Sequence, residues 1–219
     1  MAELTLVIGN KNYSSWSLRP WLLLKQAGIP FREVYIPTHT PQSRAAILEH
    51  SPAGRVPVLH DGNTTVWESL AICEYLAEQF PDKQLWPADR TARALARAVA
   101  AEMHAGFGAL RTHMTMNCRR SFPDKGRTPE VVADIERLRG LWNDCRKRFG
   151  SGGDFLFGHF SIADAMYAPV ATRFKTYAVE LDKVSASYRD AILALPAMQQ
   201  WYTDAAAEHE VIDEYESRV

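Results

Sequence analysis

Two serines stand at the start of a predicted helix and are the first residues of the chain that could do chemistry. The apolar stretch Leu4 to Gly9 leads into a polar turn that ends in Ser14 and Ser15, and the apolar run Trp16 to Leu24 follows. This order predicts a strand, a turn and a helix. The two hydroxyls could cap the helix, which is the more common role of serine there, or face an anionic ligand at the positive helix end.

Two other short motifs place polar groups beside apolar runs. Pro57 interrupts the run from Arg55 to His60. A proline inside a strand cannot donate to the ladder, so it lies at an edge or bulge, or Val56-Pro57 is cis and turns backbone groups toward a ligand. Glu68 and Ser69 open another predicted helix, where a second anion could be held.

A stripe of mixed residues in the second half could line a pocket. Met, His, Phe, Leu and Arg recur there at spacings of three and four, at Met103, His104, Phe107, Leu110, Arg111, Met114 and Met116. Such spacing more often marks a core face. Methionine on the same stripe as histidine and arginine also suits a wall that adapts to varied apolar ligands.

The elements that must position these residues alternate in the first half of the chain. Strands are predicted at 4–9 and 31–36, helices at 18–27, 41–50 and 70–79, and a hairpin at 55–67 around Asp61-Gly62-Asn63. Alternation of this kind predicts a parallel pair of strands joined by a right-handed crossover.

A proline-containing segment, Phe80 to Pro87, separates this half from one that is helical in character. Helices are predicted at 91–120, 130–149, 161–172 and 196–208, with a charged tail after the last. Ser161 and Asp164 form a capping-box pattern, and Pro169 should bend or break its helix. We therefore expect domains at 1–81 and 91–219 joined by a linker at 82–90.

Composition excludes several classes of function. The 219 residues are 47% hydrophobic and 23% charged, with a net charge of −1, so there is no basic field for nucleic acid or anionic lipid. No apolar run approaches the ~20 residues that span a bilayer, and no targeting segment is evident. Cys73, Cys118 and Cys145 form no CxxC pair, and no metal-ligand spacing is present. We expect a cytoplasmic protein without a metal, a membrane or a nucleic-acid partner.

The order of elements resembles the glutathione transferase superfamily over almost the whole chain, with expected membership among its bacterial proteins. Residues 14–19, Ser-Ser-Trp-Ser-Leu-Arg, are similar to the Ser-Ser-Cys-x-x-Arg motif of the zeta class, the maleylacetoacetate isomerases. Gln42, Val56-Pro57 and Glu68-Ser69 fall at matching places. The resemblance implies an α+β thioredoxin-like domain (βαβαββα) followed by an all-α domain.

The resemblance also implies a co-substrate, glutathione, and a role for each motif. Ser14 would donate to the glutathione thiolate, with Ser15 and then Tyr13 as alternatives. Glu68 and Ser69 would hold the γ-glutamyl end, and Val56, next to a cis Pro57, would pair with the cysteinyl backbone. Gln42, with His39 or Arg44 as further candidates, would lie near the glycyl end.

The second-substrate pocket implied by the resemblance would include Tyr13, Trp16, Met103, Phe107, Arg111, Met114 and Arg173. Trp16 replaces the cysteine of the zeta motif, and Arg173 lies about one helical turn before the place of the family's carboxylate-binding arginine. We therefore expect a homodimeric transferase that attacks small electrophiles, as in detoxification. The alternatives are a maleyl-type cis-trans isomerase and a non-catalytic interaction protein of the same fold.

Overall fold

The computed structural model describes residues 3–217 and begins with a mixed four-stranded sheet of order β2-β1-β3-β4. Strand β1 (Leu4–Ile8) pairs in parallel with β2 (Phe31–Tyr35) and antiparallel with β3 (Val58–Asp61), which forms a hairpin with β4 (Thr64–Trp67). The predicted parallel pair and the hairpin are both confirmed, and the fold class is the expected one.

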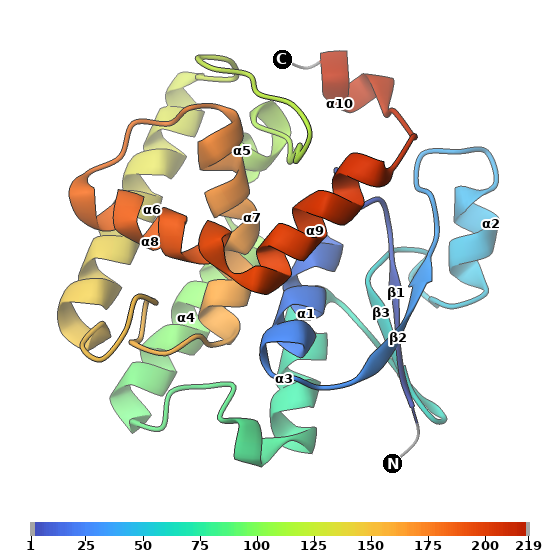
Figure 1. The fold of residues 1–219 in the computed structure, drawn as a ribbon, viewed down its shortest axis with the longest axis horizontal. Helices are drawn as coiled ribbons and strands as arrows, with labels where there is room; N and C mark the ends of the chain where they lie inside the picture. Colours follow the sequence, from blue (N-terminus) through green and yellow to red (C-terminus); the bar gives the residue numbers. More distant parts are fainter. Residues whose placement is uncertain (1–2, 218–219) are drawn as a thin grey trace.

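Helices cover both faces of this sheet (Figure 1). Leu6 and Ile8 of β1 point to the face covered by α1 (Ser15–Gln26) and α3 (Ser69–Gln79), and they join the main hydrophobic core. Val7 points to the opposite face and packs with Ile47 of α2 (Ser43–Leu48) in a separate small core. Successive side chains of β1 point to opposite faces of the sheet, so the strand contributes residues to both cores.

The rest of the described chain is helical. After the short 3-10 turn η1 (Pro81–Lys83), the elements are α4 (Arg90–Ala105), α5 (Gly108–His113), α6 (Pro129–Phe149), α7 (Ile162–Thr176), α8 (Lys183–Ala194), α9 (Pro196–Ala207) and α10 (Asp213–Ser217). No helix within residues 3–217 is long and apolar enough to cross a bilayer.

One expectation about this half is wrong, and of the bend or break expected at Pro169 the break does not occur. The predicted helix at 91–120 is two helices, because Gly106 leaves the helical region and Phe107 has a left-handed φ of 57° that cannot continue α4. Helix α7 runs past Pro169 without a break. It is enclosed on all sides, and this packing holds the helix although the proline cannot donate to the ladder. Helices α8 and α10 were not anticipated.

The predicted capping box at the start of α7 is confirmed and is fully enclosed. The carboxylate of Asp164 accepts from the backbone N–H of Leu156 (3.0 Å), the backbone N–H and hydroxyl of Ser161 (2.8 and 3.1 Å), and the hydroxyl of Tyr188 (3.0 Å). Burial raises the pKa of Asp164 to about 6, and the donors act in the opposite direction. This carboxylate ties the loop before α7 to α8.

Lys11 joins the turn after β1 to the helical half. Its Nζ makes ion pairs with Glu33 of β2 (2.8 Å) and Asp204 of α9 (2.7 Å), and it lies over the rings of Trp21 and Trp201 at 5.1 and 5.5 Å. These contacts, which we call the Lys11 clamp, fix the turn that leads to Ser14.

We predict that Asp164→Ala lowers the free energy of unfolding by about 3 to 5 kcal/mol, because several buried donors lose their acceptor together. Urea unfolding followed by circular dichroism measures this change. Asp190→Ala is the matched control, since Asp190 forms only a surface pair with Arg189 and should cost less than about 1 kcal/mol. A loss for Asp164→Ala no larger than that of the control contradicts the prediction.

Candidate functional site

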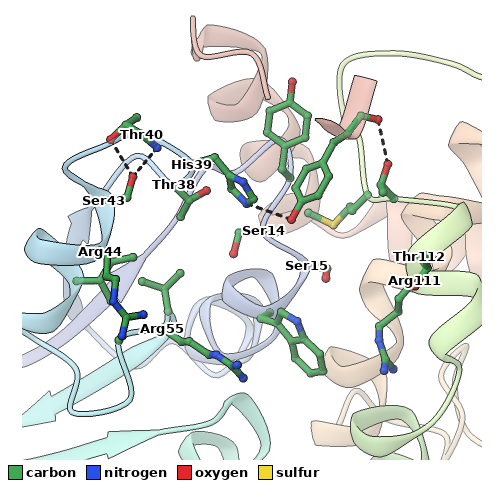
Figure 2. Close-up of a pocket in the computed structure, with 18 of the residues that line it drawn as sticks. Ser14, Ser15, Thr38, His39, Thr40, Ser43, Arg44, Arg55, Arg111 and Thr112 are labelled. Carbon is green, nitrogen blue, oxygen red and sulfur yellow. Dashed lines mark hydrogen bonds between the residues drawn. The ribbon is translucent and has the colours of Figure 1, made fainter. Parts of the chain in front are cut away.

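A cavity of about 690 Å³ lies at the N-terminus of α1, between the sheet half and the helical half. We call it the large cavity (Figure 2). Its lining residues come from the start of α1 and the turn before it, from α2 and the loop before it, from the loop before β3, from α5 and the segment after it, and from α7 and α10. They are Tyr13, Ser14, Ser15, Trp16, Thr38, His39, Thr40, Ser43, Arg44, Ile47, Gly54, Arg55, Val56, Gly108, Arg111, Thr112, Thr115, Met116, Arg173 and Tyr215.

Ser14 is the N-cap of α1 and belongs to a chain of hydrogen bonds. Its hydroxyl donates to Ser17 Oγ at 2.7 Å, and its Oγ accepts weakly from the backbone N–H of Ser17 at 3.4 Å. Ser17 Oγ in turn accepts from the backbone N–H of Gly9 at 3.1 Å, and Ser17 is fully buried. If both hydroxyls rotate, Ser17 donates to Ser14, and the proton of Ser14 becomes available to a ligand. Sequence reasoning missed Ser17, although its place three residues after the cap was visible.

Ser14 and Ser15 face different sides of the large cavity. Figure 2 shows Ser14 on the side of Thr38 and His39, and Ser15 on the side of Arg111 and Thr112. The Ser15 hydroxyl makes no hydrogen bond with any residue from 3 to 217. The two candidate hydroxyls are therefore placed to meet different parts of a bound ligand.

Gly9 allows Ser14, Thr38 and Val56 to come together. A Cβ at this position would lie 2.8 Å from Thr38 Cγ2, 3.2 Å from Val56 Cγ2 and 3.5 Å from Ser14 Cβ. The first distance is shorter than any normal contact, so a larger residue would push these groups apart. Ser14 therefore lies beside Val56, the residue that sequence reasoning placed at the cysteinyl backbone.

A second, smaller cavity of about 120 Å³ adjoins the first and holds three more of the expected residues. Val56, Pro57, Glu68 and Ser69 all line it, and Trp16 lines both cavities. The Val56-Pro57 bond is cis, which was one of the two alternatives. Val56 thus stands between the two cavities.

Ser69 and Glu68 differ in their surroundings. Ser69 begins α3, is 1% exposed, and its Oγ has no hydrogen-bond partner among the described residues. Glu68, the residue before the helix, has a left-handed φ of 69°, and its carboxylate lies 3.5 Å from His104 Nε2. An unpartnered buried hydroxyl at a helix N-terminus suits an anionic group. The pKa of His104 is lowered by burial first, and Glu68 opposes that shift.

Gln42 lies at the edge of the site instead of in it. It is exposed at the N-cap of α2 and lines neither cavity. Its neighbours Ser43 and Arg44 do line the large cavity. Thr40 and Arg55 line it as well, and neither of these two was among the residues selected from the sequence.

The expected pocket residues of the helical half divide into two groups. Arg111, Arg173 and Met116 line the large cavity. Met103, Phe107 and Met114 lie in the hydrophobic core instead and do not line it. The short helix α5 brings Gly108 and Thr112 to the cavity in their place, because the break at Phe107 rotates the chain after α4.

Positive charge gathers on the large cavity. Four arginines line it, at positions 44, 55, 111 and 173, and no aspartate or glutamate within residues 3–217 does so. Arg173 is 3% exposed and donates to the carbonyls of Met114 (2.8 Å) and Pro169 (3.3 Å). Burial, followed by repulsion from Arg111, lowers the pKa of Arg173 to about 10, so it stays charged at neutral pH. The cavity therefore favours anionic ligands.

Tyr13 is engaged with the C-terminal segment, residues 208–217. Its hydroxyl donates to Glu216 (2.7 Å) and accepts from Arg119 Nη2 (3.0 Å) and, more weakly, from the backbone N–H of Ile212 (3.4 Å). The same segment brings Tyr215 to the cavity, where its hydroxyl lies 3.2 Å from His39 Nε2. The C-terminal segment thus bridges the two halves across the large cavity (Figure 2).

Comparison with known proteins assigns the family. The family model for the glutathione S-transferase N-terminal domain matches residues 13–79, and the model for the C-terminal domain matches residues 92–204. The chain belongs to the glutathione S-transferase family. It is a glutathione transferase enzyme with relatives in the zeta class, as the resemblance implied.

Two curated relatives and one solved structure illustrate this relation. The chain is 29% identical to a probable maleylacetoacetate isomerase of Caenorhabditis elegans over 164 residues, 73% of this chain and 75% of that one. It is 26% identical to glutathione S-transferase Z2 of Arabidopsis thaliana over 207 residues, 86% and 88% of the two chains. A Burkholderia glutathione transferase homologue solved with bound glutathione has a TM-score of 0.72 and 25% identity, covering 94% of this chain and 100% of that one.

We predict that Gly9→Ala weakens glutathione binding by about tenfold or more, because an overpacked Cβ moves Thr38 and Val56 away from Ser14. Isothermal titration calorimetry of the folded variant measures the dissociation constant. Gly140→Ala in α6 is the matched control, since a Cβ there meets nothing within 4 Å and should leave binding unchanged. Equal affinity of the two variants would show that the close approach at Gly9 does not shape the site.

Proposed function

We propose that this glutathione transferase uses the Ser14 hydroxyl to hold the glutathione sulfur as a thiolate, which attacks small electrophilic substrates in the large cavity. The observation that carries the proposal is the position of the Ser14 hydroxyl at the cavity beside Val56, where it donates to Ser17 Oγ, which also accepts from the Gly9 N–H. Ser17 can become the donor when Ser14 turns its proton toward a ligand. Ser15, which faces Arg111, is the alternative donor of a hydrogen bond to the thiolate. If Ser14 has that role, Ser15 contacts the electrophile.

Glutathione would lie along the motifs that line the two cavities. Its γ-glutamyl carboxylate suits the unpartnered Ser69 hydroxyl and the N-terminal N–H groups of α3, and Glu68 can accept from the adjacent ammonium. Its cysteinyl backbone suits the main chain of Val56, and its glycyl carboxylate lies toward His39, Arg44 or Gln42. This placement brings the thiol to Ser14.

The reaction begins with loss of the thiol proton to solvent. The free thiol has a pKa of about 8.5, so it is mostly protonated at neutral pH. A donated hydrogen bond from Ser14 and the dipole of α1 both favour the anion, and a lowering of about two units corresponds to ~3 kcal/mol. The thiolate then forms a sulfur–carbon bond, and the leaving group departs with the bonding electron pair.

The assembly and the location of the protein are part of this proposal. We propose a cytoplasmic homodimer, with domains at 1–81 and 91–219, because glutathione transferases are usually dimeric and the three cysteines of this chain are unpaired.

A second candidate function is glutathione-dependent cis-trans isomerisation of a maleyl-type acid. Arg111 and Arg173 reach the large cavity from two helices, and no carboxylate among residues 3–217 lines it, although Asp134 lies near enough to Arg111 to favour its charged form. In such a reaction the thiolate adds to the double bond, the carbon–carbon bond rotates, and expulsion of the thiolate restores the double bond. Trp16 in place of the zeta cysteine weighs against this candidate, and the arginines favour it.

We predict that Ser14→Ala raises the pKa of bound glutathione by about one to two units and lowers kcat/KM by about 10² at pH 6.5. Ser17→Ala should raise the pKa by about half as much, because it removes only the partner that orients Ser14. Ultraviolet absorbance of the bound thiolate across pH 5 to 10 measures the shift. Ser15→Ala is the matched control, and a larger shift for it than for Ser14→Ala would assign the role to Ser15.

For the second candidate, we predict that Arg111→Met raises KM for a maleyl-type acid at least tenfold but leaves KM for a neutral electrophile within about twofold. The reason is that the variant loses a charge-assisted hydrogen bond from Arg111 to the substrate carboxylate, which is worth about 1.5 to 3 kcal/mol. Arg148→Met, at an exposed ion pair on α6, serves as the control. Absence of isomerase turnover in the wild type would remove this candidate and leave the transferase proposal intact.

A further inference from the structure

Arg19 is a fully buried arginine that has no acidic partner within residues 3–217. Its Nε donates to the carbonyl of Met166 at 3.2 Å, and its guanidinium carbon lies 4.0 Å from the centre of the Trp16 ring. Neither Nη1 nor Nη2 has a hydrogen-bond partner among the described residues. It is one of the largest side chains that the fold encloses completely.

The groups that face Arg19 do not neutralise it. Arg173 on α7 and Arg111 on α5 repel its charge, and His104 on α4 is in turn affected by Arg19. The thiol of Cys73 on α3 and the hydroxyl of Tyr167 on α7 are buried, and burial raises the pKa of each, so both stay neutral at pH 7. Burial, then Arg173 and Arg111, lowers the pKa of Arg19 to about 9, which leaves the side chain mostly charged at neutral pH.

Stability does not explain this arrangement. A buried charge loses its hydration, and only a well-placed counter-ion with further hydrogen bonds restores that loss. Arg19 has one backbone carbonyl as acceptor, that of Met166, and its guanidinium stacks on the ring of Trp16. An apolar side chain of similar length would fill the same space without the desolvation penalty, so the folded state gains little from the charge itself.

The position of Arg19 connects it to the site. It follows Ser15 by four residues, so the two side chains lie on the same face of α1, one turn apart. Trp16, on which the guanidinium stacks, lines both cavities. The charge therefore lies directly behind the wall where the thiolate is expected, in surroundings that screen it less than water does.

We propose that Arg19 is a positioning residue whose buried positive charge, one helical turn behind Ser15 and against Trp16, stabilises the anionic form of bound glutathione. The inference rests on the proposed function and deepens it. Arg19 adds to the α1 dipole and the Ser14 hydroxyl without touching the sulfur, and it holds Trp16 in place between the two cavities.

Two neutral variants separate the charge from the contacts of the side chain. Arg19→Met keeps the length and the contact with Trp16, and Arg19→Gln keeps an N–H donor near the Met166 carbonyl. Both should raise the pKa of bound glutathione by about one unit, the order of shift expected for one charge acting at about 10 Å through protein. The melting temperature of free Arg19→Met should equal or exceed that of the wild type.

A neutral-sulfur ligand supplies an independent readout. S-Methylglutathione has no thiol to ionise, so its dissociation constant should stay within about twofold of the wild-type value in both variants. Arg97→Met is the matched control, because Arg97 also lies over a tryptophan, Trp86 at 5.5 Å, but is exposed and paired with Glu74. It should change neither the pKa of the bound thiol nor the binding of either ligand.

The outcomes distinguish this inference from the proposed function. If the wild type binds no glutathione or does not lower its thiol pKa, the proposed function fails. If the wild type lowers the pKa and the folded Arg19 variants keep it unchanged, Arg19 is structural and the inference is overturned. A failure of Arg19→Met to fold leaves the test to Arg19→Gln.

Discussion

The Lys11 clamp is the interaction on which the arrangement of the site depends. The ammonium of Lys11 lies between Trp21 and Trp201 and is paired with Glu33 and Asp204, which belong to the two halves of the chain. Trp201 Nε1 also donates to the carbonyl of Lys11 at 2.8 Å. Since this turn leads directly to the cap of α1, contacts with the helical half fix where Ser14 lies.

The adjoining backbone is held in the same way. The carboxylate of Glu208 accepts from the N–H groups of Lys11 and Asn12 at 2.5 and 3.0 Å, and the Asn12 side chain accepts from the N–H groups of Cys118 and Arg119 at 2.8 and 3.0 Å. The turn thus has few free backbone groups. A rigid turn holds the Ser14 hydroxyl in place before a ligand arrives, which lowers the reorganisation that stabilising an anion requires.

Positive charge on and behind the cavity wall is the second feature of the site, although Asp134 lies near enough to Arg111 to favour its charged form. Arg111 and Arg173 line the large cavity, and Arg19 lies behind Trp16, with no carboxylate on the cavity wall. Several other arginines of this chain form exposed ion pairs, as Arg137 does with Glu102 and Arg97 does with Glu74. The contrast indicates that the helical half supplies electrostatics to the site as well as a wall, and that charge at the site is kept at some expense of stability.

The sequence by itself determined the local elements and the residues at their ends. Strand periodicity, Pro and Gly breaks and capping residues predicted the sheet, α1, α3, α6 and the capped start of α7, because these signals act within a few residues. The same reasoning missed α8, although Asp182 caps its start, and the break at Phe107, although glycines stand on both sides of it. They also placed Ser14, Val56 and Ser69 at element ends, where the structure has them.

Only the tertiary structure decided which side chains meet at the cavity. Helical spacing groups Met103, Phe107, Arg111 and Met114, but it does not say which of them face the core, and three of the four do. Tyr215 reaches His39 across most of the chain, and Arg119 reaches Tyr13 in the same way, contacts that no local pattern contains. Packing between distant segments sets these contacts. The sequence therefore predicted several residues of the site, but only the folded chain determines which side chains line the cavity.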